Sequence, residues 1–86
     1  MNRRRLLRRL ASGAVRNVAF ADIVDLTTAF GFVLIRVRGS HHIFSHPDVP
    51  HLLNLQEVGG QAKPYQIRQL LRLVERYNLR MEERDA

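Results

Sequence analysis

The 86-residue sequence contains no cysteine and no tryptophan. The absence of cysteine excludes disulfides, a thiolate nucleophile and cysteine-bound metal, and it fits a reducing compartment. Apolar runs are short as well: residues 32–35 are followed by an arginine, whereas a membrane-spanning helix needs about 20 apolar residues. We therefore expect a cytoplasmic protein with no membrane partner.

The chain has room for one small domain, because a protein of this length buries only about 60% of the surface that its unfolded form exposes. Its five glycines match neither the Walker nor the dinucleotide-binding pattern. The 45% hydrophobic and 26% charged residues are ordinary for a globular protein. These observations exclude a two-domain enzyme with a separate substrate lobe and predict a single folded domain.

Acidic residues are missing from the amino-terminal segment. Residues 1–16 hold six of the fourteen basic residues, which leaves eight basic and eight acidic residues in the rest of the chain. Leu6, Leu7 and Leu10 are spaced for one helical face. Three interpretations compete: a flexible basic tail, which we favour, a segment like a transit peptide, and an arm that contacts nucleic acid. The predicted organisation is a flexible basic arm over residues 1–17, a domain over residues 18–80 and a charged tail over residues 81–86.

The body of the chain shows two helical and three extended patterns. Ile23, Leu26 and Phe30 recur at helical spacing, and Pro64 suits the first turn of a second amphipathic helix. The prolines in residues 47–50 are expected to interrupt the extended pattern. The predicted order is a helix over residues 20–30, strands over 32–37, 41–46 and 51–56, and a helix from Pro64 to about Asn78. This order predicts an α+β two-layer sandwich with the helices on one face of a three-stranded antiparallel sheet.

Four histidines fall within eleven residues, namely His41, His42, His46 and His51. Strand alternation places His41 on one face of its strand, and His42, Phe44 and His46 on the other. If Phe44 enters the core, His41 points to the open side of the sheet, where a substrate can reach it. An imidazole titrates near neutral pH, so His41 is the favoured catalytic candidate.

Two other interpretations of the histidines stay open at this point. His42 and His46 lie four residues apart, or about 13 Å along a straight strand, so they do not chelate one metal ion unless the strand bends. The histidines are otherwise ordinary side chains of a sheet. We expect no metal and no cofactor.

The run Gly39-Ser40-His41-His42-Ile43-Phe44-Ser45-His46-Pro47, which follows Gly31-Phe32 and Arg36, resembles the signature of the HicA family of mRNA-interferase toxins. The resemblance covers roughly residues 18–79. It implies a fold like that of a double-stranded-RNA-binding domain, histidine-dependent cleavage of RNA, and inhibition by a HicB-type antitoxin. The histidine of the family's Gly-Ser-His sequence falls on His41.

The resulting hypothesis is a metal-independent endoribonuclease toxin whose partners are RNA and a HicB-type antitoxin, in a homo-oligomer or a toxin–antitoxin hetero-oligomer. His41 is the predicted catalytic residue, and His42 and Ser40 are alternative or assisting groups. The alternative function is a non-catalytic RNA- or antitoxin-binding module with the same fold. The candidates for binding RNA phosphates are Arg36, Arg38, Lys63, Arg68 and Arg72.

Overall fold

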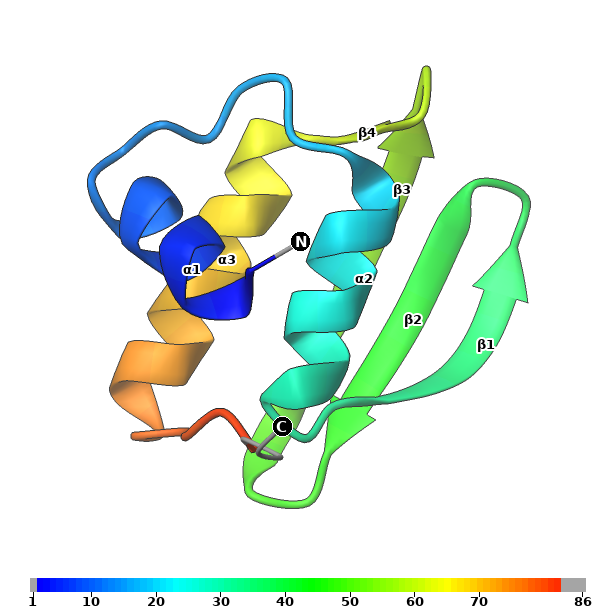
Figure 1. Ribbon diagram of the computed structural model, residues 1–86. Helices are drawn as coiled ribbons and strands as arrows, with labels where there is room; N and C mark the ends of the chain where they lie inside the picture. The colour runs from blue at the N-terminus through cyan, green and yellow to red at the C-terminus, as the bar shows by residue number, and fades with distance from the viewer. Residues whose placement is uncertain (1, 83–86) are drawn as a thin grey trace.

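The computed structural model describes residues 2–82, which form three helices and one four-stranded antiparallel sheet (Figure 1). The elements are α1 (Arg3–Ala11), α2 (Phe20–Ala29), β1 (Val33–Arg38), β2 (His41–His46), β3 (Val49–Val58), β4 (Gln61–Ala62) and α3 (Pro64–Arg76). The strands lie in the order β1-β2-β3-β4. The predicted α+β class is confirmed, and the arrangement is consistent with a sandwich like that of a double-stranded-RNA-binding domain.

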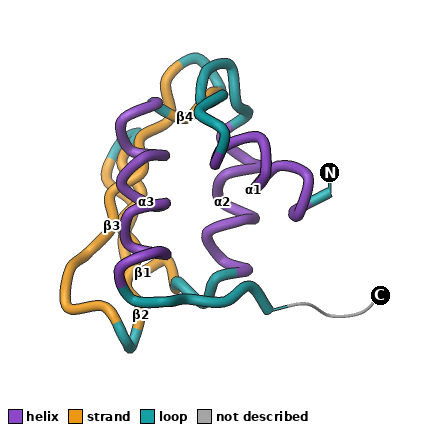
Figure 2. Tube along the Cα trace, turned by 90° about the vertical axis from the view of Figure 1, so that its left-hand side faces the viewer, coloured by secondary structure: helices purple, strands orange, loops and turns teal. Residues whose placement is uncertain are grey.

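The helices all lie on one side of the sheet (Figure 2). Helices α2 and α3 pack on the sheet, and α1 lies against these helices on the side away from the strands. The opposite face of the sheet carries no helix among residues 2–82. We call this surface the open face. No helix in the described part of the chain is long and apolar enough to span a membrane.

The number of strands differs from the prediction, because β4 adds a fourth strand to the predicted three. Gly59 and Gly60 have φ angles of 58° and 77° and join β3 to β4 in a two-residue turn. A two-residue hairpin of this type requires positive φ at both positions, which glycine adopts without strain. A strand of two residues has no periodicity of its own, and for this reason the apolar pattern does not reveal it.

The start of β3 also differs from the prediction. The strand begins at Val49 and includes Pro50, whereas we expected residues 47–50 to interrupt the sheet. The β2–β3 ladder pairs His46 with Val49 and Phe44 with Leu53, with an irregularity between the two pairs. Pro50 falls in this irregular stretch, where its missing N–H removes no regular ladder bond.

The amino-terminal segment is folded onto the helical layer rather than extended as a separate arm. Its residues 3–11 form α1, and Leu10, which is only 1% exposed, joins Leu6 in the core cluster that also contains residues of α2, α3 and the sheet. The predicted boundary at residue 17 therefore cuts through one continuous core. The six-residue end that we predicted as a charged tail lies partly outside the described residues.

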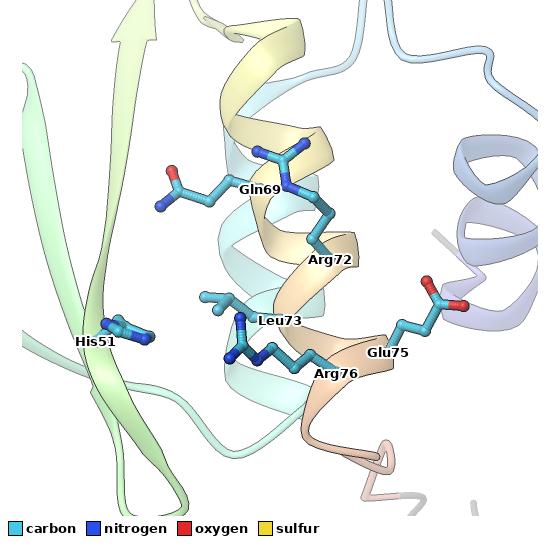
Figure 3. A pocket seen from close by; sticks show the side chains of 6 residues that line it. All are labelled: His51, Gln69, Arg72, Leu73, Glu75 and Arg76. Atoms are coloured by element: carbon cyan, nitrogen blue, oxygen red, sulfur yellow. The ribbon is translucent and has the colours of Figure 1, made fainter.

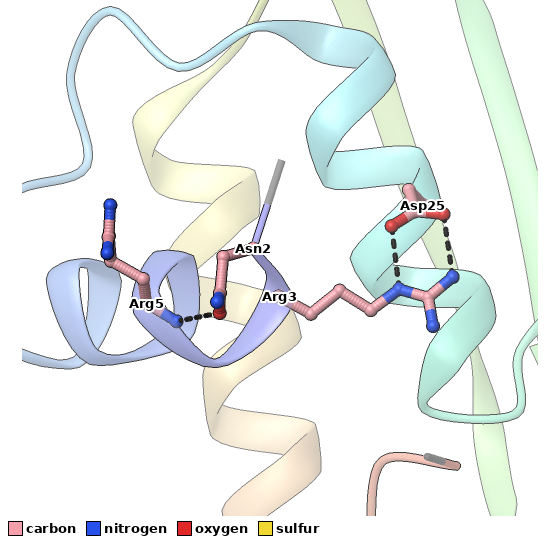
Figure 4. Close-up of polar contacts among 4 residues, drawn as sticks. All are labelled: Asn2, Arg3, Arg5 and Asp25. Carbon is pink, nitrogen blue, oxygen red and sulfur yellow. Dashed lines mark hydrogen bonds and ion pairs between the residues drawn. The ribbon is translucent and has the colours of Figure 1, made fainter. Parts of the chain in front are cut away.

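Polar contacts attach α1 to its neighbours (Figure 4). Asn2 caps the helix, its side-chain oxygen accepting a hydrogen bond from the backbone N–H of Arg5 at 2.9 Å. Arg3 forms a bidentate pair with Asp25 of α2, at 2.7 Å from Nε and 2.9 Å from Nη2. The pair fixes the orientation of α1 across α2.

The Arg3–Asp25 pair predicts a pH-dependent stability. Hydrogen bonding from Arg3 lowers the pKa of the Asp25 carboxyl below its ordinary value. The resulting stabilisation is present above the unfolded-state pKa of about 3.9 and is lost as the pH falls through the lower folded-state pKa. We expect Asp25→Asn to lower the melting temperature by at most a few degrees at pH 7, because both side chains are partly exposed, and to have no effect near pH 2.

The control for this experiment is Asp48→Asn, which removes a carboxylate from an exposed turn. Calorimetric melting curves of both variants at several pH values provide the comparison. A pH-independent difference between Asp25→Asn and the parent would contradict the assigned role of the ion pair.

Candidate functional site on the open face of the sheet

Strand β2 separates its histidines between the two faces of the sheet. Phe44 is buried beneath the helices, the His42 ring centre lies 4.8 Å from that of Phe20, and the His46 ring centre lies 5.0 Å from that of Phe32. By alternation, His41 lies on the open face. The burial of Phe44 is the condition on which we based the choice of His41 over His42.

An amide on the adjacent strand holds the His41 ring. Nδ1 of His41 lies 3.2 Å from Oδ1 of Asn54 in β3. An amide oxygen only accepts hydrogen bonds, so this contact places the proton of the neutral ring on Nδ1. Nε2 is then left with its lone pair, in the tautomer that can accept a proton.

Sequence reasoning did not identify Asn54. The available signal was its position between Leu53 and Leu55, since a polar residue flanked by two core residues of a strand faces away from the core. Pairing of His41 with Asn54 also depends on the register between β2 and β3, in which His41 is opposite Gln56 and Ile43 is opposite Asn54. Asn54 is therefore diagonal to His41 on the same face.

Strand β1 brings two of the predicted phosphate-binding residues to the same face. In the β1–β2 ladder Arg38 is opposite His41, and Arg36 is opposite Ile43. Directly paired residues of antiparallel strands share a face, so both guanidinium groups lie beside the His41 ring on the open face. Both arginines are exposed, and no ion pair to either is found among residues 2–82. The result is a cationic surface around one imidazole.

The other three predicted phosphate-binding residues belong to the helical layer. Lys63 precedes α3, with its Nζ 5.9 Å from the Tyr65 ring centre, and Arg68 is exposed on α3. Arg72 lines a hollow of about 420 Å³ between α3 and β3 (Figure 3). The full lining of this hollow is His51, Gln69, Arg72, Leu73, Glu75 and Arg76. The structure therefore does not bring Arg68 and Arg72 together with His41.

The predicted assisting groups make structural contacts. Nδ1 of His42 lies 3.3 Å from the backbone oxygen of Ser40, and its ring packs on Phe20 in the helical layer. The Ser40 hydroxyl accepts a hydrogen bond from the Gln56 side chain at 3.3 Å. His42 thus faces away from the surface that His41 occupies.

His46 joins β2 to the end of α2. Its Nε2 donates to the backbone oxygen of Phe30 at 3.0 Å, and its Nδ1 accepts from the backbone N–H of Asp48 at 3.0 Å. Gly31, with φ of 97°, allows this approach, because a Cβ there would lie 2.9 Å from Nε2 of His46. Both ring nitrogens are used, so His46 has a structural role. Within residues 2–82, no three His, Asp or Glu side chains are grouped to hold a metal ion.

The fold and the open face define a small α+β domain that carries a single oriented histidine between an amide and two arginines. Residues 20–75 match the family model described as the HicA toxin of bacterial toxin–antitoxin systems, and this match covers more than half of the chain. The chain therefore belongs to the HicA toxin family, and membership implies an antitoxin partner. No curated protein matches the chain, and no solved structure matches it.

Proposed function

We propose that this toxin is an endoribonuclease that acts on mRNA without a metal ion, with His41 as its catalytic base. The observation that carries the proposal is the orientation of the ring. Asn54 occupies Nδ1 at 3.2 Å, and Nε2 is left to accept a proton on a face that no described helix covers. A base held by a third group in this way is the common arrangement of an activated nucleophile site.

In the proposed reaction, Nε2 of His41 removes the proton of a ribose 2′-hydroxyl. The 2′-oxygen forms a bond to the adjacent phosphorus, and the bond from phosphorus to the 5′-oxygen breaks. The departing 5′-oxygen takes a proton from water, which leaves a 2′,3′-cyclic phosphate on the upstream fragment. The imidazolium then releases its proton to solvent, so the enzyme returns to its starting state.

Arg36 and Arg38 bind the phosphate in this proposal. Their positions opposite Ile43 and His41 put two fixed positive charges beside the base, where the phosphorane develops negative charge. Acid–base catalysis by one group is worth about 10²–10⁴-fold, so the arginines must supply additional electrostatic stabilisation. We expect a slow nuclease that is sufficient to inhibit growth.

The proposed function is tested with an RNA oligonucleotide and a matched oligonucleotide that has deoxyribose at the cleaved position. In the presence of EDTA, the purified toxin is expected to cleave the RNA and to leave the deoxy-substituted linkage intact, because that linkage lacks the attacking hydroxyl. Gel electrophoresis and mass spectrometry of the fragments detect the cyclic phosphate. Cleavage at the deoxyribose would contradict the mechanism, and binding without cleavage would favour the non-catalytic module.

Asn54 is a positioning residue in this proposal. We expect Asn54→Ala to reduce the cleavage rate by at least about tenfold, but by less than the loss of the base itself. We expect Asn54→Asp to retain activity and to move the acid limb of the pH–rate profile to higher pH, because a carboxylate stabilises the imidazolium form. A residue that only supports the fold would not move the pH profile.

The control for Asn54 is Gln56→Ala, which removes an amide from the same strand without removing a contact to the His41 ring. Its pH–rate profile should coincide with that of the parent toxin. An unchanged profile for Asn54→Asp would show that Asn54 does not act through the histidine.

A further inference from the structure

Strand β1 exposes an unusual amount of apolar surface. Val33, Leu34, Ile35 and Val37 are 58%, 45%, 50% and 52% exposed. Single exposed apolar residues are common on protein surfaces, but a contiguous apolar patch usually marks a binding surface. Four such residues within a five-residue stretch form a patch of this kind.

The patch is exposed because of the position of β1 in the fold. The strand is at the edge of the sheet and pairs only with β2, and in Figure 1 it extends beyond α2, away from α3. The backbone groups along its outer side therefore have no neighbouring strand. An edge strand of this kind is a template for pairing with a strand of another chain.

The register with β2 assigns the side chains of β1 to two faces. Leu34 and Val37 are opposite Phe44 and His42, which places both on the helical side of the sheet. Arg36 and Arg38 are on the open face, as described above. A strand added to this edge would therefore meet apolar side chains on one face and two cations on the other.

These charges disfavour a second copy of the toxin as the occupant. Residues 33–38 contain two arginines and no acid, so pairing of β1 with itself would place four cations on one short edge without a carboxylate. Charged side chains on edge strands are a common means of preventing self-association. A segment with carboxylates at alternate positions and apolar residues between them matches both faces.

We propose that β1 binds an extended, acidic segment of the antitoxin as a fifth strand of the sheet. Membership in the toxin family implies the antitoxin, and the charge and apolar pattern of β1 specify the chemistry of its binding segment. If the proposed function holds, this segment also covers Arg36 and Arg38 and so competes with the RNA phosphate. The antitoxin would then inhibit the toxin from the edge of the sheet.

The probe is a short peptide with blocked ends that alternates valine and glutamate, compared with one that alternates valine and lysine. Titrated into ¹⁵N-labelled toxin, the glutamate peptide should shift the amide resonances of residues 33–38 and slow their hydrogen exchange, with a Kd on the order of 1 mM or tighter. The lysine peptide should not bind there. No RNA is present, so the result does not depend on nuclease activity.

Charge reversal supplies the decisive variant. In Arg36→Glu/Arg38→Glu, binding of the glutamate peptide should weaken by at least about tenfold and the lysine peptide should bind instead. The matched control, Arg68→Glu/Arg72→Glu, makes the same charge change on α3 and should bind like the parent. The proposal is overturned if the peptide does not bind, if it shifts residues outside β1, if charge reversal has no effect, or if sedimentation shows that β1 pairs two toxin copies.

Discussion

Substitution of His41 by alanine is expected to lower the rate of RNA cleavage by about 10²–10⁴-fold. The melting temperature should change little, because the His41 side chain is half-buried and its hydrogen bond to Asn54 lies on the open face rather than in the core. Initial rates on a single-stranded RNA oligonucleotide measure the first quantity, and calorimetry measures the second. In cells, expression of the variant should no longer arrest growth.

His51→Ala is the matched control for this experiment. His51 is also an exposed histidine of the sheet, but its ring lies 6.4 Å from that of Tyr77 and lines the hollow beside α3. Its removal should leave the cleavage rate unchanged. Cleavage at the parental rate by His41→Ala would exclude His41 as the catalytic base, whatever the result for His51.

The largest effect on stability is expected from Leu10→Ala. Leu10 is 1% exposed and connects α1 to the core, so its truncation should lower the free energy of unfolding by about 2–5 kcal/mol. A small domain has only about 5–15 kcal/mol of stability, and the variant is therefore expected to lose a large part of it. Urea unfolding followed by circular dichroism measures the change.

Leu7→Ala provides the comparison, because Leu7 is on the same helix but only partly buried against the core. Its effect should be clearly smaller than that of Leu10→Ala. Equal and small effects of the two substitutions would show that α1 does not unfold together with the rest of the domain. They would then support the separate amino-terminal arm that the charge pattern suggests.

Local pattern was sufficient for much of this fold. Helix α2, helix α3 and strand β2 were predicted from apolar spacing, because each buries one regular face. The same alternation placed His41 opposite to Phe44 and therefore on the open face, and this is the part of the site that sequence reasoning could reach. The Gly59-Gly60 pair is a recognised hairpin signal, although the prediction did not use it for β4.

The remaining features depend on contacts between residues far apart in the chain. The partnership of His41 with Asn54 requires a particular β2–β3 register, and the placement of Arg36 and Arg38 beside the ring requires the register of β1. The arginine-rich composition of the first helix concealed its role, because Leu6 and Leu10 become core residues only where α2 and α3 present an apolar surface to them. Strand pairing and helix docking join segments whose local patterns carry no information about each other, so tertiary packing alone selects which side chains meet.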